Sequence, residues 1–224
     1  MADPYFMGKC IQSGVESANK VVEKSFPSEA VGVVARIDGK IQVVEYSEIS
    51  VETSEQRNPD GKLAFRAGNI CNHFFAVDFL SRVCSDEILK ALPEHVAKKK
   101  IPHMKDGLLV QPTEPNGIKL EKFVFDVFQF STSFLVWECR RDEEFSPLKN
   151  ADGVGKKDTP TTAREAVFTL HRQFVERAGG KVVCPAASKQ NSAVVCEISP
   201  LTSYAGENLE PLVEGQSLEA PICL

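Results

Sequence analysis

The sequence predicts an α/β fold, and three observations support this prediction. β-Branched segments alternate along the chain with segments of helical spacing. Two β-branched runs within residues 31–46 are joined by Asp38-Gly39, the dipeptide that a type I′ hairpin turn requires. The chain has 224 residues, of which 42% are hydrophobic, so it can build one large domain or a domain and a half around a sizeable core.

The first elements follow from local signals. Asp3 can cap a helix whose first turn contains Pro4, and Gly14 is a suitable residue to end it. Residues 20–24 (KVVEK) predict a strand, which Pro27 terminates.

A further strand is predicted over residues 67–75 (AGNICNHFF), after a turn cluster at residues 58–61. Its polar members Asn69, Asn72 and His73 need hydrogen-bond partners if they are buried. For His73 we expect neighbouring backbone groups to supply these partners, in preference to a functional role.

The central part of the chain predicts a helix followed by a strand. From Ile118 onward apolar residues recur at helical spacing, with Phe125 and Phe130 off the main stripe. Residues 134–139 (FLVWEC) then predict a strand.

The last third begins with a Gly- and Lys-rich loop at residues 151–160. Thr159-Pro160 opens a long amphipathic helix that Gly179-Gly180 ends. Short strands and polar loops follow, and residues 185–195 are expected to be the most mobile stretch.

Charge and composition argue against several classes of protein. The formal net charge is −5, whereas a surface that tracks nucleic-acid phosphates needs clustered Lys and Arg. The basic runs at 98–100 and 156–157 are interpreted as solvated faces. No secretory leader and no apolar run of about eighteen residues is evident, so no membrane partner is expected.

The cysteines indicate a cytoplasmic protein with reduced, mostly buried thiols. Their number is odd, their spacing is irregular and no CxxC pair occurs, which also argues against structural zinc. The seven are Cys10, Cys71, Cys84, Cys139, Cys184, Cys196 and Cys223.

Residue chemistry alone gives little indication of function. The sequence contains no P-loop, no GxGxxG, no GxSxG and no HExxH motif. Glu45 and Glu48 lie three positions apart, so on a strand they would point to opposite faces and could not form an acid/base pair.

Several long segments together resemble the eukaryotic UDP-N-acetylhexosamine pyrophosphorylases, over about residues 1–210. They are GVVARIDGKIQVVEYSEIS (32–50), AGNICNHFF (67–75), PNGIKLEKFVFD (115–126), EFSPLKNAD (144–152), PTTAREA (160–166) and CEISPLTSYAGENLE (196–210). The resemblance implies the C-terminal part of a nucleotide-diphospho-sugar transferase (Rossmann-like) α/β domain, with a small C-terminal β-containing subdomain. We expect residues 1–150 to be the sugar-binding half and residues 151–224 the C-terminal helix and β subdomain.

The activity that the resemblance implies is a nucleotidyltransferase of amino sugar metabolism. It forms UDP-N-acetylglucosamine or UDP-N-acetylgalactosamine and pyrophosphate from UTP and N-acetylhexosamine 1-phosphate. The family's Gly-rich basic loop for the UTP phosphates, and the acidic residues that help hold Mg²⁺, are not found in this sequence. The chain is therefore expected to be inactive by itself, with the Mg²⁺ ligands elsewhere and no metal ligand assigned here.

The resemblance also implies roles for individual residues that bind the sugar. Glu45 would accept hydrogen bonds from sugar hydroxyls, and the alternative is an exposed acid at a strand end. Gly32 would let the backbone approach the ligand, or be an ordinary strand glycine. The Asn69 amide would bind hydroxyls, or be satisfied within the strand.

The remaining assignments concern an apolar wall and two cations. Phe123 and Phe125 match the wall that packs on the N-acetyl methyl, although Phe123 also lies on the predicted core stripe. Lys149 matches the catalytic lysine that meets phosphate, since a lysine is a compact point charge. Lys119 would assist as a further substrate-binding residue.

Three interpretations of the isolated chain remain. It could be part of an active enzyme, a non-catalytic UDP-sugar-binding module that pairs with a full-length homologue or forms a homo-oligomer, or a half-domain that does not fold alone because its sheet has an unpaired edge.

Overall fold

The structure is a computed structural model that describes residues 3–184 and 194–224, and the chain forms two compact units. The first comprises Met1–Cys139 and the second Arg140–Leu224. The sequence-based boundary was residue 150. The short helix α5 (Arg141–Glu144) belongs to the second unit, where Glu143 pairs with Arg177 of a later helix at 2.6 Å.

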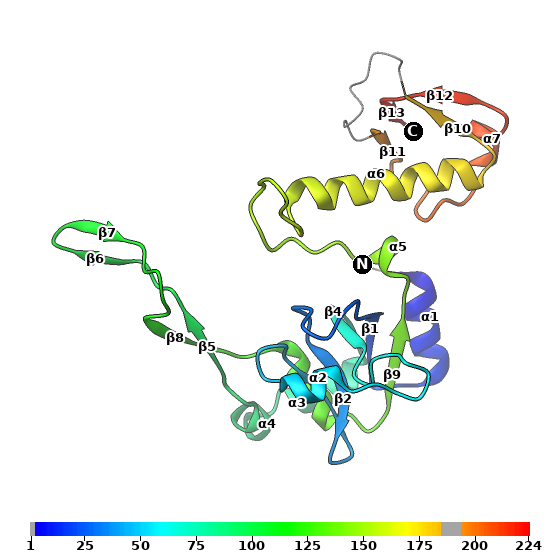
Figure 1. The fold of residues 1–224 in the computed structure, drawn as a ribbon. Coiled ribbons are helices and arrows are strands. Elements are labelled where there is room, and N and C mark those ends of the chain that lie inside the picture. Colours follow the sequence, from blue (N-terminus) through cyan, green and yellow to red (C-terminus); the bar gives the residue numbers. More distant parts are fainter. Residues whose placement is uncertain (1–2, 185–193) are drawn as a thin grey trace. The chain divides into compact units, whose positions relative to one another are not determined.

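A five-stranded mixed sheet forms the centre of the first unit, with strand order β3-β2-β4-β1-β9 (Figure 1). β9 lies parallel to β1, and the β1–β4, β2–β4 and β2–β3 pairs are antiparallel. This mixed sheet with flanking helices confirms the predicted α/β class. The strands are β1 (Ser17–Glu23), β2 (Val33–Ile37), β3 (Lys40–Val44), β4 (Ala67–Phe75) and β9 (Phe134–Glu138).

Helix α1 (Pro4–Ser13) has the boundaries that its capping residues predict. The Asp3 carboxylate accepts hydrogen bonds from the backbone N–H groups of Tyr5 and Phe6, and Gly14 ends the helix at φ 61°. Asp3 also forms an ion pair with Lys20 of β1 at 2.7 Å, where the Lys20 side chain is only 2% exposed. The cap and the ion pair together attach α1 to the sheet.

The hairpin β2–β3 also confirms its prediction. Asp38 and Gly39 have φ values of 49° and 79°, the left-handed backbone that a type I′ turn needs at both central positions. The turn sets the register, which pairs Ile37 with Lys40 and places Val33 opposite Val44. The end of β3 that leads to the site is thereby fixed.

Strand β4 confirms the predicted strand, and its histidine, His73, lies in an aromatic environment. The His73 ring meets Phe75, Phe125 and Phe128 edge to face, with the shortest centroid distance, 5.2 Å, to Phe128. Burial lowers the pKa of His73 to about 4. Its Nε2 lies 3.2 Å from Asn69 Oδ1, so a side chain and not the backbone supplies its polar partner.

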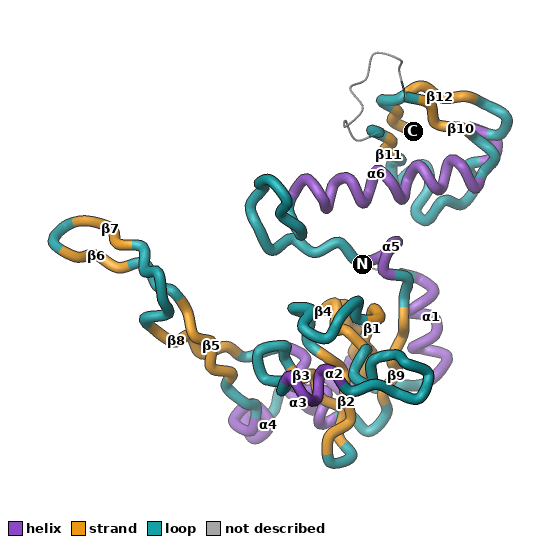
Figure 2. The backbone as a smooth tube through the Cα atoms, in the orientation of Figure 1, coloured by secondary structure: helices purple, strands orange, loops and turns teal. Residues whose placement is uncertain are grey.

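Beyond β4, short helices lead into a long two-stranded arm that leaves the sheet (Figure 2). In the arm β5 pairs with β8, and β6 pairs with β7. The sequence did not predict β5, β6 or β7. The elements after β4 are α3 (Val77–Val83), α4 (Asp86–Ala91), β5 (His95–Lys99), β6 (His103–Lys105), β7 (Leu108–Val110) and β8 (Gly117–Glu121). The short helix α2 (Val51–Glu55) lies between β3 and β4.

The predicted helix from Ile118 is wrong. Residues 117–121 form strand β8, and the 3-10 helix η1 (Val124–Phe130) follows. Ile118 and Leu120 alternate with charged residues and are exposed, which is the period of a strand. Apolar residues of η1 pack into the core. The apolar residues of β8 and η1, taken together, recur in the sequence at the spacing of one continuous helix, which explains the wrong prediction.

The second unit confirms the long helix α6 (Pro160–Arg177), which begins at its cap Thr159. Phe174 and Val175 of α6 pack against Leu209 and Val213 in a separate apolar core. Of the stretch predicted to be mobile, residues 185–193 lie outside the described residues. The other elements are β10 (Lys181–Val183), β11 (Cys196–Glu197), α7 (Glu210–Val213), β12 (Ser217–Glu219) and β13 (Ile222–Cys223).

Among the described residues, no helix combines the length and apolar character needed to cross a membrane.

Candidate functional site

The segment after β3 is a turn, and this overturns the predicted geometry of its two acids. β3 ends at Val44, and the backbone N–H groups of Glu48 and Ile49 both donate to the carbonyl of Glu45, at 2.9 and 3.0 Å. The Glu45 N–H in turn donates to the Glu48 carboxylate at 3.3 Å. Glu45 and Glu48 therefore do not lie on opposite faces of a strand, because the chain has already left the sheet.

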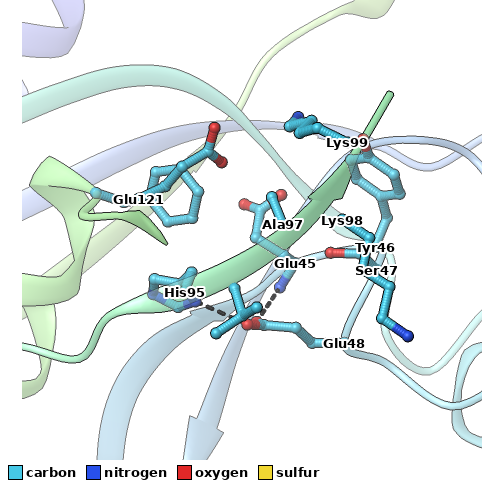
Figure 3. A pocket seen from close by; sticks show the side chains of 11 residues that line it. Glu45, Tyr46, Ser47, Glu48, His95, Ala97, Lys98, Lys99 and Glu121 are labelled. Atoms are coloured by element: carbon cyan, nitrogen blue, oxygen red, sulfur yellow. Dashed lines mark hydrogen bonds and ion pairs between the residues drawn. The ribbon is translucent and has the colours of Figure 1, made fainter. Parts of the chain in front are cut away.

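A cavity of about 470 Å³ opens beside this turn (Figure 3). The turn supplies Glu45 and Glu48, strand β5 supplies His95, Lys98 and Lys99, and the end of β8 and the following residues supply Glu121 and Phe123. The cavity thus has carboxylates, ammonium groups, an imidazole and the aromatic rings of Tyr46 and Phe123. Such a mixed lining suits a polar ligand that carries a small apolar group.

Gly32 faces the first of these carboxylates at very close range. A Cβ at position 32 would lie 2.6 Å from Glu45 Oε1 and 2.9 Å from Val43 Cγ1, which real Cβ atoms do not tolerate. An alanine at this position would displace the end of the Glu45 side chain and the Val43 methyl, so the glycine lets Glu45 lie where it does.

Asn69 lies directly behind Gly32. Its backbone N–H donates to the Gly32 carbonyl at 2.8 Å, and the residue is 6% exposed. Its side-chain oxygen accepts from Asn19 Nδ2 at 3.0 Å and from the Cys71 N–H at 2.9 Å, and also faces His73. The oxygen is fully used, and the amide nitrogen donates to Cys71 Sγ over a long contact of 3.7 Å. Asn69 is not among the residues that line the cavity.

The two predicted wall residues occupy different positions. The rings of Phe123 and Phe125 stack at 4.9 Å with an angle of 21°. Phe123 lines the cavity, whereas Phe125 is 5% exposed and packs in the core with Val21, Val43 and Phe128. Phe123 therefore presents the apolar surface, and Phe125 supports it from behind.

Sequence reasoning missed His95, which lies at the centre of the polar contacts. His95 Nδ1 is 2.7 Å from Glu48 Oε1, and Nε2 is 3.2 Å from both carboxylate oxygens of Asp126. Its ring lies 4.7 Å from that of Phe123. Burial opposes a charge on His95, but hydrogen bonds to the two carboxylates outweigh it and raise the pKa above the ordinary value of 6.5.

Lys119 lies on β8 with its side chain 65% exposed, and forms an ion pair with Glu121 at 3.0 Å. The hydrogen bond from Lys119 lowers the pKa of Glu121. Lys119 thus reaches the cavity through Glu121 and is not itself part of the lining.

Lys149 belongs to the second unit, where its surroundings are a fastened loop. The backbone N–H groups of Lys149 and Asn150 both donate to the Asp158 carbonyl, at 2.8 and 3.0 Å. Asp152 accepts from the N–H of Thr161 in the first turn of α6 at 3.2 Å. These bonds fix the backbone on both sides of the exposed lysine side chain.

A second cavity of about 520 Å³ lies in the same unit, lined in part by Arg141, Phe145, Lys157 and Asp158. Lys149 is adjacent to it through its hydrogen bond to Asp158.

No metal centre is built from the part of the chain that the structure describes. Within residues 3–184 and 194–224, no three side chains of His, Cys, Asp or Glu are grouped so that they could hold an ion. The described residues therefore do not form a Mg²⁺ site.

Comparison with known proteins supplies the family. The model for UTP–glucose-1-phosphate uridylyltransferase matches residues 1–198. UDP-N-acetylhexosamine pyrophosphorylase-like protein 1 of Xenopus tropicalis is 52% identical over 98% of this chain and 45% of its own length. UDP-N-acetylglucosamine pyrophosphorylase of Saccharomyces cerevisiae is 46% identical over 93% of this chain and 43% of its own length.

A solved structure agrees with these relatives. The uridine diphosphate N-acetylglucosamine pyrophosphorylase of Trypanosoma brucei, crystallised with an inhibitor, superposes with a TM-score of 0.72 and 32% identity. The match covers 94% of this chain and 42% of that one. The chain spans about half the length of the curated relatives it matches. By the match over residues 1–198, the chain belongs to the UTP–glucose-1-phosphate uridylyltransferase family, in the branch of the UDP-N-acetylhexosamine pyrophosphorylases.

Proposed function

We propose that this chain carries the sugar-binding side of a UDP-N-acetylhexosamine pyrophosphorylase. The reaction joins the uridylyl group of UTP to N-acetylglucosamine 1-phosphate or its galactosamine epimer and releases pyrophosphate. The observation that carries the proposal is that Glu45 and Phe123 line one cavity, with Gly32 packed against the Glu45 carboxylate, although the three come from separate parts of the sequence. The resemblance had assigned all three residues to the sugar.

The polar residues divide the hydroxyl contacts between them. The Glu45 carboxylate accepts hydrogen bonds from sugar hydroxyls, and two adjacent hydroxyls can share its two oxygens. The Asn69 amide nitrogen would exchange its long contact to Cys71 Sγ, 3.7 Å, for a sugar hydroxyl, because the Asn69 oxygen already accepts from Asn19 and Cys71. Acceptor and donor together fix the orientation of a hexose.

Phe123 supplies the selectivity for an acetamido sugar. Its ring is an apolar aromatic surface of the cavity, and the methyl of an N-acetyl group would pack on it. A contact of this size discriminates by about 1 to 3 kcal/mol. A hexose without the N-acetyl group would leave this ring without a partner.

The chemical step is an in-line displacement. An oxygen of the sugar phosphate attacks the α-phosphorus of UTP, the bond to the β-phosphate oxygen breaks, and pyrophosphate leaves. Such transfers depend mainly on positioning and on cations that stabilise charge, so no general base is needed. We assign the stabilising charge in this chain to Lys149.

Calorimetric titration of the chain with UDP-N-acetylglucosamine and UDP-glucose, beside a pyrophosphate-release assay, tests the proposal. Binding with turnover supports an enzyme, and binding without turnover supports a UDP-sugar-binding module. Gly32→Ala should weaken binding because the added methyl would displace the Glu45 carboxylate and the Val43 side chain. Gly8→Ala is the matched control, since nothing lies within 4 Å of a Cβ there. A wild-type chain that folds and binds neither nucleotide would contradict the proposal.

Lys149→Ala tests the catalytic assignment wherever turnover is measured. We expect turnover to fall more than tenfold with little change in sugar affinity, because the lysine meets phosphate and not the hexose. Lys156→Ala, in the same loop, is the control for a general loss of positive charge. Near-normal turnover of the Lys149 variant would remove this residue from the mechanism.

A further inference from the structure

We propose that His95 is a positioning residue that holds Phe123 in place and thereby sets the preference of the cavity for acetamido sugars. This inference rests on the proposed function, because it names a residue that tunes the same site. The resemblance did not assign His95 any role.

The first argument is the direct contact between the two rings. The centroids of His95 and Phe123 are 4.7 Å apart at an angle of 38°, and both residues line the cavity. Figure 3 labels His95 beside Glu48. Phe125 stacks on Phe123 at 4.9 Å. The Phe123 ring therefore has one aromatic neighbour from β5 and another from η1.

The second argument is that one carboxylate holds both residues. Asp126 Oδ2 accepts a hydrogen bond from the Phe123 backbone N–H at 3.1 Å, and Asp126 also faces His95 Nε2 at 3.2 Å. Asp126 is 8% exposed, so these bonds form where water competes little. The backbone of Phe123 and the ring that packs on it are thus fixed from the same point.

The third argument is that His95 is itself held at both nitrogens. Nδ1 faces Glu48 at 2.7 Å, and the side chain of His95 is 15% exposed. Carboxylates only accept hydrogen bonds, so facing one at each nitrogen favours the doubly protonated ring. Four acidic side chains and two lysines surround the cavity. The acids are Glu45, Glu48, Glu121 and Asp126, and the lysines are Lys98 and Lys99.

The consequence concerns selectivity more than affinity in general. If His95 no longer packs on Phe123, the ring can move away from the position where an N-acetyl methyl would meet it. A sugar with a plain hydroxyl gains nothing from this ring and loses nothing when it moves. The ratio of the two affinities should therefore change, and not the affinity for both sugars equally.

The test compares dissociation constants for UDP-N-acetylglucosamine and UDP-glucose by calorimetry in wild type, His95→Gln and His95→Phe. His95→Gln keeps a hydrogen-bond donor without the ring, and His95→Phe keeps a ring without the donors. We expect wild type to prefer the acetamido sugar at least tenfold, and both variants to reduce that ratio threefold or more. His103→Gln, an exposed histidine of the same arm, should leave it unchanged.

Glu48→Gln is a milder variant that tests the same contact if the His95 variants do not fold. It weakens the hydrogen bond to His95 Nδ1 without removing the His95 ring. It should reduce the ratio by less than the His95 substitutions do. Folded His95 variants that retain the wild-type ratio would overturn this inference and leave the proposed function standing. A folded wild type that binds neither nucleotide would overturn both.

Discussion

Two histidines of the first unit show how the same side chain is used in opposite ways. His73 lies on β4 among Phe75, Phe125 and Phe128, and burial lowers its pKa to about 4. His95 lies on β5 between two carboxylates, which raise its pKa above 6.5. At neutral pH the first is therefore uncharged.

This difference gives each histidine a distinct place: His73 lies behind the site, and His95 lines the cavity. Neutral His73 completes the hydrogen bonds around the Asn69 oxygen without placing a charge inside the aromatic core. His95 instead balances acids at the cavity and packs on the ring that faces it. A neutral support among aromatic rings and a cavity-side ring held by two carboxylates are thus built from one residue type, distinguished by what surrounds each ring.

The largest expected effect is acid destabilisation by His73. In the unfolded chain its pKa is near 6.5, whereas the folded chain keeps the ring neutral down to about pH 4. Protons therefore bind the unfolded state preferentially in this window, and the free energy of unfolding falls as pH drops from 6.5 to 4. One such group changes the folding equilibrium by at most about tenfold per pH unit, and by less where the ring is only half-buried.

Urea unfolding of wild type and His73→Gln across this pH range measures the effect. The glutamine keeps a hydrogen-bond donor for Asn69 but cannot titrate. The free energy of unfolding of this variant should therefore decrease less between pH 6.5 and pH 4. Parallel pH dependence in the two proteins would show that His73 is not the residue responsible.

Elements with strong local signals could be predicted from the sequence, and the arm could not. Asp38-Gly39 fixed a hairpin, and the caps at Asp3 and Thr159 fixed two helices, because each depends on neighbours in the chain. The arm strands are short, and their apolar residues are exposed: Val96, Met104, Leu108 and Ile118 are 61–72% accessible. A strand without a buried face leaves little periodic signal.

The site was predictable only in part for a similar reason. The resemblance supplied Glu45 and Phe123, which line one cavity, and Gly32, which packs against Glu45. His95 was missed because its partners Glu48 and Asp126 lie 47 and 31 positions away in the sequence. Pairing over such distances is set by the fold, and nothing in the residues around His95 distinguishes it from any surface histidine.

His95 should produce the opposite pH dependence, with a smaller amplitude. Because its folded pKa lies above the unfolded value of 6.5, its contribution to stability is complete below pH 6.5 and disappears as pH rises through the folded pKa. Unfolding of His95→Phe should therefore depend less on pH than that of wild type on the alkaline side of 6.5. If wild type instead gained stability there relative to the variant, the assigned carboxylate contacts would be contradicted.

The smallest effect is expected at Glu48, the more exposed of the two carboxylates that face His95. The Glu48 side chain is 41% exposed, so its pair with His95 is screened by water, and such surface pairs contribute about 0.2 to 1 kcal/mol. Glu48→Gln should cost no more than this at low salt, and the difference from wild type should shrink in about 1 M salt, where screening is strong. Glu55→Gln, at the exposed end of α2, controls for the change in net charge. Equal salt dependence of the two variants would mean that Glu48 acts through overall charge and not through His95, leaving Asp126 as the carboxylate that holds the ring.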